Sequence, residues 1–259
     1  MDITADEIKR MKREYGPGAI MSGTGSHHLW GILGYWLSSH RRFFNSIGWT
    51  PIMHNPDSWE GWFWGAVHHW GNSMRLGASE TYGTVEDLLK ECEMIVFWSS
   101  DPEATGGVYG AFEGTARRQW LKDLGIKLVH IDPFYNHTAA LLGGKWLAPR
   151  PATGNALALA IAYVWITEDL YDKRYVAERT VGFDQWKEYI LGRDDGIPKT
   201  PEWQENESAI PAKDVRALAR EWGTKKTYLA AGGIAGFGSA CRCATGNEWA
   251  RSMVCLMAM

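Results

Sequence analysis

Cysteine is scarce in this sequence, and its spacing argues against one class of site. The chain has 259 residues and only four cysteines, none of them in a C-x-x-C pair. Because iron–sulfur clusters need closely grouped thiolates, we expect no cluster in this segment. So few cysteines are also more typical of a reducing compartment than of a disulfide framework, which predicts a cytoplasmic location.

Basic charge and long apolar runs are lacking as well. The formal net charge is -3 and the isoelectric point lies near 6.2, so the chain offers no basic field for nucleic acid. The apolar run from Ala156 to Ile166 stops at Thr167, well short of the ~20 residues needed to cross a bilayer. We therefore expect neither a nucleic-acid partner nor a membrane span.

Tryptophan is abundant, and histidine concentrates in the first third of the chain. The sequence has 15 tryptophans, and those between residues 49 and 70 indicate either an aromatic-lined pocket or a tryptophan-rich packing layer. Six of the eight histidines fall in the first third: His27, His28, His40, His54, His68 and His69. Adjacent side chains diverge on a helix, which disfavours zinc chelation by His68 and His69 and favours histidines in a hydrogen-bonded polar layer.

His27 and the pair Asp57-Ser58 differ from the other polar residues in their position. His27 follows the first predicted strand, while Asp57 and Ser58 open a helical stretch after Asn55-Pro56, so both could point into one cleft. A histidine with a nearby carboxylate can pass protons near neutral pH. The serine could bind an anion, act as a nucleophile, ligate a hard metal or simply cap the helix, and the residues alone leave these alternatives open.

Short apolar runs alternate with helical patterns along the chain. Strands are predicted at 19–23, 94–98, 127–131 and 228–231, and helices at 4–15 (from a capping box at Thr4 to Glu7), 29–47, 115–124 and 212–222. This alternation predicts an α/β fold with parallel, doubly wound sheets. The loops that follow the strands, 23–26, 99–102, 132–137 and 232–238, would then form one ligand-binding edge suited to a phosphate-bearing cofactor. Residues 192–211 are polar and rich in proline and glycine, which predicts a surface excursion.

Three strings of residues carry a family resemblance. They are Ser26-His27-His28-Leu29-Trp30-Gly31, His54-Asn55-Pro56-Asp57-Ser58-Trp59-Glu60-Gly61-Trp62 and Ile95-Val96-Phe97-Trp98-Ser99-Ser100-Asp101-Pro102. With them, the chain resembles catalytic subunits of the dimethyl sulfoxide reductase family of molybdopterin oxidoreductases, and in particular its transhydroxylase-like members. The resemblance spans nearly the whole chain.

The resemblance implies a cofactor and roles for named residues. The cofactor would be bis-molybdopterin guanine dinucleotide carrying molybdenum or tungsten, with Ser58 as a metal ligand and His27 and Asp57 as acid–base residues. The nucleotide-holding residues would be Ser99, Ser100, Asp101, Asp132, Thr153, Gly232 and Gly233. A phenolic substrate is implied, with a hydroxyl group moved between positions of trihydroxybenzenes, from pyrogallol to phloroglucinol. An iron–sulfur electron-transfer subunit would be the partner.

The family layout also implies a domain boundary and leaves rival functions. Residues 1–57 would belong to a first α/β domain and 58–259 to a second, nucleotide-binding one, both of them parts of a larger subunit. Family members usually have aspartate after the threonine that matches Thr153, and here that residue is Gly154, so a guanine contact is either lost or supplied by Asn155. The alternatives are an S-oxide or N-oxide reductase of the same family and an inactive nucleotide-binding module.

Overall fold

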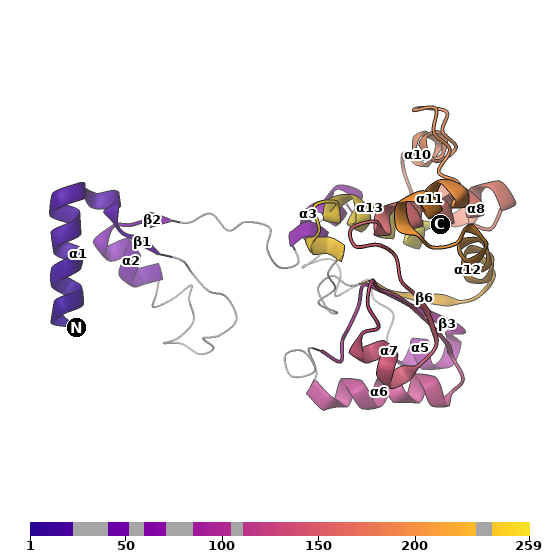
Figure 1. Ribbon diagram of the computed structural model, residues 1–259, viewed down its shortest axis with the longest axis horizontal. Coiled ribbons are helices and arrows are strands. Elements are labelled where there is room, and N and C mark those ends of the chain that lie inside the picture. Colours follow the sequence, from indigo (N-terminus) through magenta and orange to yellow (C-terminus); the bar gives the residue numbers. More distant parts are fainter. Residues whose placement is uncertain (23–40, 52–59, 71–84, 105–110, 232–239) are drawn as a thin grey trace. The chain divides into compact units, whose positions relative to one another are not determined.

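The computed structural model describes residues 1–22, 41–51, 60–70, 85–104, 111–231 and 240–259 (Figure 1). The chain divides into two compact units, residues 1–55 and 56–259, and each is described by itself. None of the helices in the described ranges is long and apolar enough to cross a membrane.

The first unit is a small helical unit with one short strand pair. Its elements are α1 (Asp2–Tyr15), η1 (Pro17–Ala19), β1 (Met21–Ser22), α2 (Arg41–Ile47) and β2 (Thr50–Pro51), with β1 parallel to β2. The predicted capping box is wrong, because α1 begins at Asp2 and Thr4 lies inside the helix. Gly16, at a φ of 91°, ends α1 in a backbone conformation that favours glycine.

The second unit is built on a four-stranded parallel sheet in the order β5-β4-β3-β6. The strands are β3 (Met94–Trp98), β4 (Lys127–Ile131), β5 (Lys145–Leu147) and β6 (Thr227–Ala231). Met94 lies opposite both Lys127 and Thr227, so β3, β4 and β6 start and end in step. The parallel sheet confirms the predicted α/β class, and three of its four strands match the predicted ones to within a residue.

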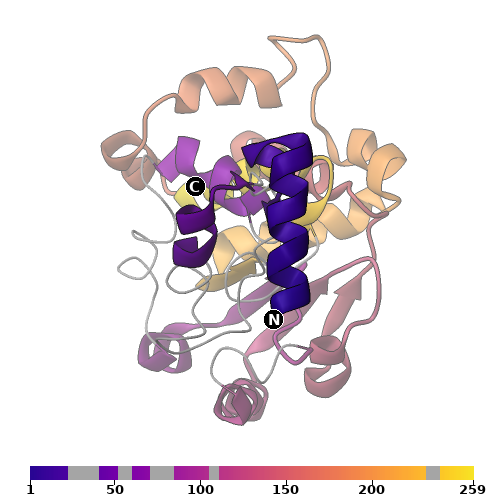
Figure 2. The ribbon, with the colours of Figure 1, turned by 90° about the vertical axis from the view of Figure 1, so that its left-hand side faces the viewer.

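Helices cover both faces of this sheet. The described helices of the second unit are α3 (Glu60–Trp70), α5 (Val85–Glu91), α6 (Ala111–Asp123), α7 (His137–Leu142), α8 (Gly154–Glu168), α9 (Lys173–Arg179), α10 (Phe183–Ile190), α11 (Pro201–Ser208), α12 (Ala212–Thr224) and α13 (Gly246–Ala258). Figures 1 and 2 show α5, α6 and α7 on one side of the strands and α8, α12 and α13 on the other.

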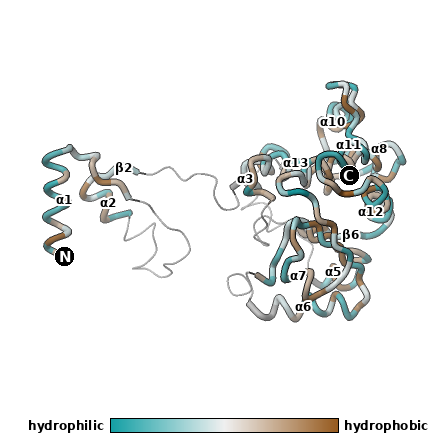
Figure 3. The backbone as a smooth tube through the Cα atoms, in the orientation of Figure 1, coloured by the Kyte–Doolittle hydropathy of each residue, from teal (hydrophilic) through white to brown (hydrophobic). Residues whose placement is uncertain are grey.

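Alternate side chains of β3 enter two separate cores. Met94, Val96 and Trp98 pack with residues of α3, α8, α12 and α13, whereas Ile95 and Phe97 pack with residues of α5, α6 and α7. This is the period-two alternation of a strand buried on both faces. Figure 3 shows apolar residues gathered along β6 and the neighbouring strands.

The segment 192–211 is a surface excursion only in part, because residues 193–198 are exposed whereas some later residues are buried. It includes α11, in which Gln204 and Ser208 are fully buried. Lys199, which lies just before this helix, has a side chain that is only 3% exposed. Gln204 Nε2 donates to the carbonyl oxygens of Pro201 and Ile210, and Ser208 Oγ donates to Gln204 Oε1. Polar side chains that satisfy one another allow Gln204 and Ser208 to be buried within this polar segment.

The strand order reverses direction at one point of the sheet. From β3 the chain moves to β4 and β5 on one side, and then returns to β6 on the other side of β3. In doubly wound sheets, ligands bind at the carboxyl ends of the strands where the order reverses in this way. The reversal lies between β3 and β6.

Candidate cofactor site

Hydrogen bonds of Ser99 fix the start of the loop after β3, where the strand order reverses. Ser99 is buried and adopts a φ of 49°, in the left-handed region. Its backbone N–H donates to Ile131 O at 2.7 Å, and its Oγ accepts from Ala240 N at 2.8 Å. The second bond joins the end of β3 to the segment that begins at Ala240, so both sides of the reversal are tied together.

Asp101 is bonded entirely to the start of α7. Its Oδ1 accepts from Thr138 N and Thr138 Oγ1 at 2.9 and 2.7 Å, and its Oδ2 accepts from His137 N and His137 Nδ1 at 3.3 and 3.0 Å. Burial alone would raise the pKa of Asp101, but the hydrogen bonds from His137 and Thr138 outweigh it and lower the pKa. The carboxylate is therefore charged at neutral pH and orients the loop.

Asp132 lies at the end of β4 and is 4% exposed. Its two oxygens accept from Phe134 N at 3.2 Å and from Asn136 Nδ2 at 3.3 Å. Burial raises the pKa of Asp132, against these two hydrogen bonds, which lower it. Asn136 also caps α7 by accepting from Ala139 N at 2.9 Å. The two strand-end loops and α7 thus share one hydrogen-bonded network.

The start of α8 leaves backbone donors available. Thr153 Oγ1 donates to Arg150 O at 2.7 Å and makes no cap bond to the helix. Asn155 Oδ1 accepts from Ser252 Oγ at 2.7 Å, so this amide oxygen is engaged within the protein. A Cβ added at Gly154 would lie 3.0 Å from Trp249 Cδ1, so the indole occupies the space that a side chain would need.

Two indole nitrogens near this helix start have no hydrogen-bond partner. Trp249 and Trp62 are 1% and 5% exposed, and within the described ranges the Nε1 of each is buried without an acceptor. Their rings pack edge to face, with centroids 5.5 Å apart. Orphaned donors beside a helix N-terminus fit an acceptor-rich group such as a phosphate or a nucleotide base.

Five of the predicted site residues lie outside the described residues. They are His27, Asp57, Ser58, Gly232 and Gly233. Their predicted roles as acid–base residues, metal ligand and nucleotide contacts stay predictions. In the described ranges, no group of three or more histidine, cysteine, aspartate or glutamate side chains could hold a metal ion.

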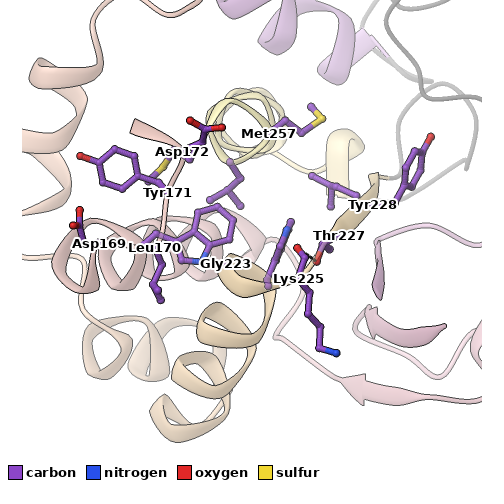
Figure 4. A pocket seen from close by; sticks show the side chains of 14 residues that line it. Asp169, Leu170, Tyr171, Asp172, Gly223, Lys225, Thr227, Tyr228 and Met257 are labelled. Carbon is purple, nitrogen blue, oxygen red and sulfur yellow. Dashed lines mark hydrogen bonds between the residues drawn. The ribbon is translucent and has the colours of Figure 1, made fainter. Parts of the chain in front are cut away.

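A hollow of about 680 Å³ lies elsewhere, at the amino end of β6 (Figure 4). Leu170, Tyr171 and Met257 line it together with Lys225 and Thr227. Thr227 is the first residue of β6, so this hollow faces away from the carboxyl ends of the strands. Its position argues against a cofactor role, because ligands of parallel sheets bind at the other edge.

Comparisons with known proteins identify relatives of the chain. No family model matches the chain. The chain is 57% identical over 258 residues to the pyrogallol hydroxytransferase large subunit of Pelobacter acidigallici, which covers all of this chain and 30% of that protein. It is 31% identical to the dimethyl sulfoxide/trimethylamine N-oxide reductase of Rhodobacter capsulatus, over 90% of this chain and 28% of that protein.

A solved structure supports the fold. The acetylene hydratase from Pelobacter acetylenicus matches the whole chain and 32% of its own length, with a TM-score of 0.63 and 20% identity. The chain spans about 30% of the length of the relatives it matches. Because the identity to several of these relatives extends along nearly the whole chain, it belongs to the dimethyl sulfoxide reductase family of molybdenum enzymes, whose cofactor is a molybdopterin.

Proposed function

We propose that the chain is part of the catalytic subunit of a transhydroxylase that moves a hydroxyl group between positions of trihydroxybenzenes and converts pyrogallol to phloroglucinol. The observation that carries this proposal is the 57% identity, along the whole chain, to a pyrogallol hydroxytransferase large subunit. The identity to the reductase from Rhodobacter capsulatus is 31%. A difference of this size favours the transhydroxylase over the reductases.

The cofactor in this proposal is bis-molybdopterin guanine dinucleotide with molybdenum or tungsten. The residues that would hold it are Ser99, Ser100, Asp101, Asp132, Thr153, Gly232 and Gly233. Three features support this assignment: the reversal of strand order between β3 and β6, the free N–H groups at the start of α8, and the orphaned indole nitrogens beside them. No iron–sulfur cluster is proposed for this segment.

The residues at the reacting centre would be His27 and Asp57 as acid–base groups and Ser58 as a metal ligand. The metal, when bound, would supply Lewis-acid and redox chemistry at the ring. The hydroxyl oxygen of Ser58 is a suitable ligand for a hard, high-valent ion. His27 and Asp57 would accept and return the phenolic protons, which requires an imidazole and a carboxylate that titrate near the working pH.

The proposed setting is a cytoplasmic enzyme of two subunits. The relative from Pelobacter acidigallici is named as a large subunit, and we propose an iron–sulfur electron-transfer subunit as the partner here. The second candidate is an S-oxide or N-oxide reductase, which the 31% identity to such an enzyme favours over an inactive nucleotide-binding module.

The test uses the full gene product, purified with its partner subunit without exposure to oxygen. Metal and pterin content are measured first, followed by conversion of pyrogallol without an external electron donor and of dimethyl sulfoxide with one. We expect about one molybdenum or tungsten per subunit and turnover of pyrogallol alone. Turnover of the sulfoxide alone would establish the reductase, and protein free of metal and pterin would refute both.

Two serine variants make the test specific. Ser58→Ala should lose activity and metal, because its hydroxyl oxygen is the proposed ligand. Ser46→Ala is the matched control, since Ser46 lies in α2, is exposed and, among the described residues, donates to Phe43 O at 2.7 Å. Full activity in Ser58→Ala, or equal loss in both variants, would contradict the ligand role of Ser58.

A further inference from the structure

We propose that Trp249 is a cofactor-binding residue, whose indole N–H donates to an acceptor atom of the bound pterin nucleotide at the start of α8. The inference rests on the proposed function and adds a contact that neither the sequence motifs nor the family resemblance assigns. It follows from three observations at one place: free backbone donors, an orphaned side-chain donor, and a glycine that leaves no room for an acceptor from the protein.

The backbone donors come from a long helix without a cap. α8 has 15 residues, and Thr153 makes no side-chain bond to it. The first acceptor bond of the helix runs from Leu157 N to Thr153 O, at 3.4 Å. Within the described ranges, the N–H groups of residues 154–156 have no acceptor. These groups and the helix dipole together favour an anionic or acceptor-rich ligand.

The orphaned donor lies directly beside these groups. Trp249 Nε1 is 3.3 Å from the position that a Cβ on Gly154 would take, and Trp98 Nε1 is 3.4 Å from the same point. Trp249 is 1% exposed, and its Nε1 has no partner among the described residues. Folded proteins seldom leave a buried N–H without an acceptor. Trp98 is the last residue of β3, so the donors gather close to the carboxyl end of that strand.

The protein does not provide the missing acceptor in its own described residues. A side chain at position 154 would collide with the indole, because even a Cβ would lie 3.0 Å from Trp249 Cδ1. The nearby polar pair Asn155 and Ser252 is engaged with itself at 2.7 Å. The backbone N–H groups at the start of α8 and the indole N–H of Trp249 are all donors. A phosphate oxygen or a base carbonyl of the nucleotide would supply the matching acceptor.

The test replaces the indole with phenylalanine, which keeps most of the ring and removes the N–H. The full gene product carrying Trp249→Phe is purified and held at a raised temperature, and bound nucleotide is followed as the nucleoside monophosphate released by acid hydrolysis. One hydrogen bond corresponds to about a five- to tenfold change in affinity, so we expect release about five- to tenfold faster. The melting temperature of cofactor-free Trp249→Phe should fall less than that of the control below, because both variants lose ring packing but only the control loses an internal hydrogen bond.

Trp165→Phe is the matched control with the opposite expectation. Trp165 is 3% exposed, and its Nε1 donates to Ala219 O at 2.7 Å. This variant should melt at a lower temperature when free of cofactor and should release nucleotide at the normal rate. Gly154→Ala is a second test, because its methyl group would push the indole aside and should also speed release.

The outcomes separate this inference from the proposed function. If the unmodified protein carries no pterin nucleotide, the proposed function fails and the role of Trp249 fails with it. If the protein carries the nucleotide and Trp249→Phe releases it at the normal rate, only the role of Trp249 is refuted. If Trp249→Phe does not fold, normal release from Gly154→Ala refutes the role, and faster release supports it.

Discussion

The carboxylate of Asp101 offers a direct test of how the candidate site is held together. It accepts four hydrogen bonds from His137 and Thr138, at the start of α7. Asp101→Asn would keep one acceptor oxygen and place an NH₂ group where the other accepted. The bond to the His137 ring contributes little, because that side chain is 73% exposed and screened by water.

The free-energy cost of Asp101→Asn follows from the other three hydrogen bonds, which come from His137 N and Thr138. Losing the bond from His137 N and weakening the two from Thr138 should cost about 2 kcal/mol, since hydrogen bonds to charged groups contribute ~1.5–3 kcal/mol each when well formed. A cost of that size would raise the rate of amide hydrogen exchange in α7 by roughly 30-fold at pH 7, if these amides exchange by local opening. Exchange of peptides covering residues 132–143 measures this directly.

The pH dependence has a definite sign. The folded pKa of Asp101 lies below its unfolded value near ~3.9, so its contribution is complete above that pH. The contribution is lost as the pH falls through the folded pKa. The difference between the natural protein and Asp101→Asn should therefore be constant near neutral pH and shrink below pH ~4.

Asp172, which caps α9, provides the control. Asp172 Oδ1 accepts from Tyr175 N at 2.8 Å at the start of α9, far from α7 in sequence. Asp172→Asn should affect exchange in α9 and leave α7 unchanged. Unchanged exchange of α7 in Asp101→Asn, or the same change in both variants, would refute the structural role given to Asp101.

Three further predictions concern buried groups. Burial lowers the pKa of His130, so the unfolded chain binds its proton more readily, and stability should fall as the pH drops from 7 to 5; the melting temperature of His130→Gln should depend less on pH over that range. Desolvation of the partly buried Cys255 thiol raises its pKa to about 12, so iodoacetamide at pH 8 should label it much faster after unfolding, and equally rapid labelling of folded protein would contradict this effect. Lys199→Met should destabilise the second unit by about 2 kcal/mol in urea, because the buried ammonium group donates to Ile197 O at 2.6 Å and lies 4.4 Å from the Tyr189 ring; an unchanged midpoint would show that these contacts contribute nothing.

The sequence predicts the sheet well where strands are rich in apolar residues. β3, β4 and β6 are short runs rich in apolar residues and bounded by polar residues, and this pattern is specific enough to locate each to within a residue. β5 has only three residues, and two of them, Lys145 and Trp146, are exposed, so it carries no such pattern. The helix α11 escapes prediction for a different reason, because its buried Gln204 and Ser208 satisfy each other's hydrogen bonds and read as loop residues.

The sequence predicts the position of the site but not the hydrogen bonds that its side chains make. The loop after β3 lies at the reversal of strand order, as expected for a ligand edge. The sequence, however, cannot show that the carboxylate of Asp101 is bonded to α7. Nor can it show that Trp249 has a free N–H, since this depends on partners distant in the chain. Only the three-dimensional contacts distinguish a tryptophan that contributes packing alone from one whose indole N–H can donate to a ligand.

A cryo-electron microscopy map of the purified gene product, with its natural cofactor, tests the location of the site most directly. We predict density for a pterin nucleotide at the carboxyl ends of β3 and β6, in contact with the start of α8 and with Trp249. A nucleotide bound instead in the hollow at the amino end of β6, or no nucleotide in fully folded protein, would contradict the cofactor site described above.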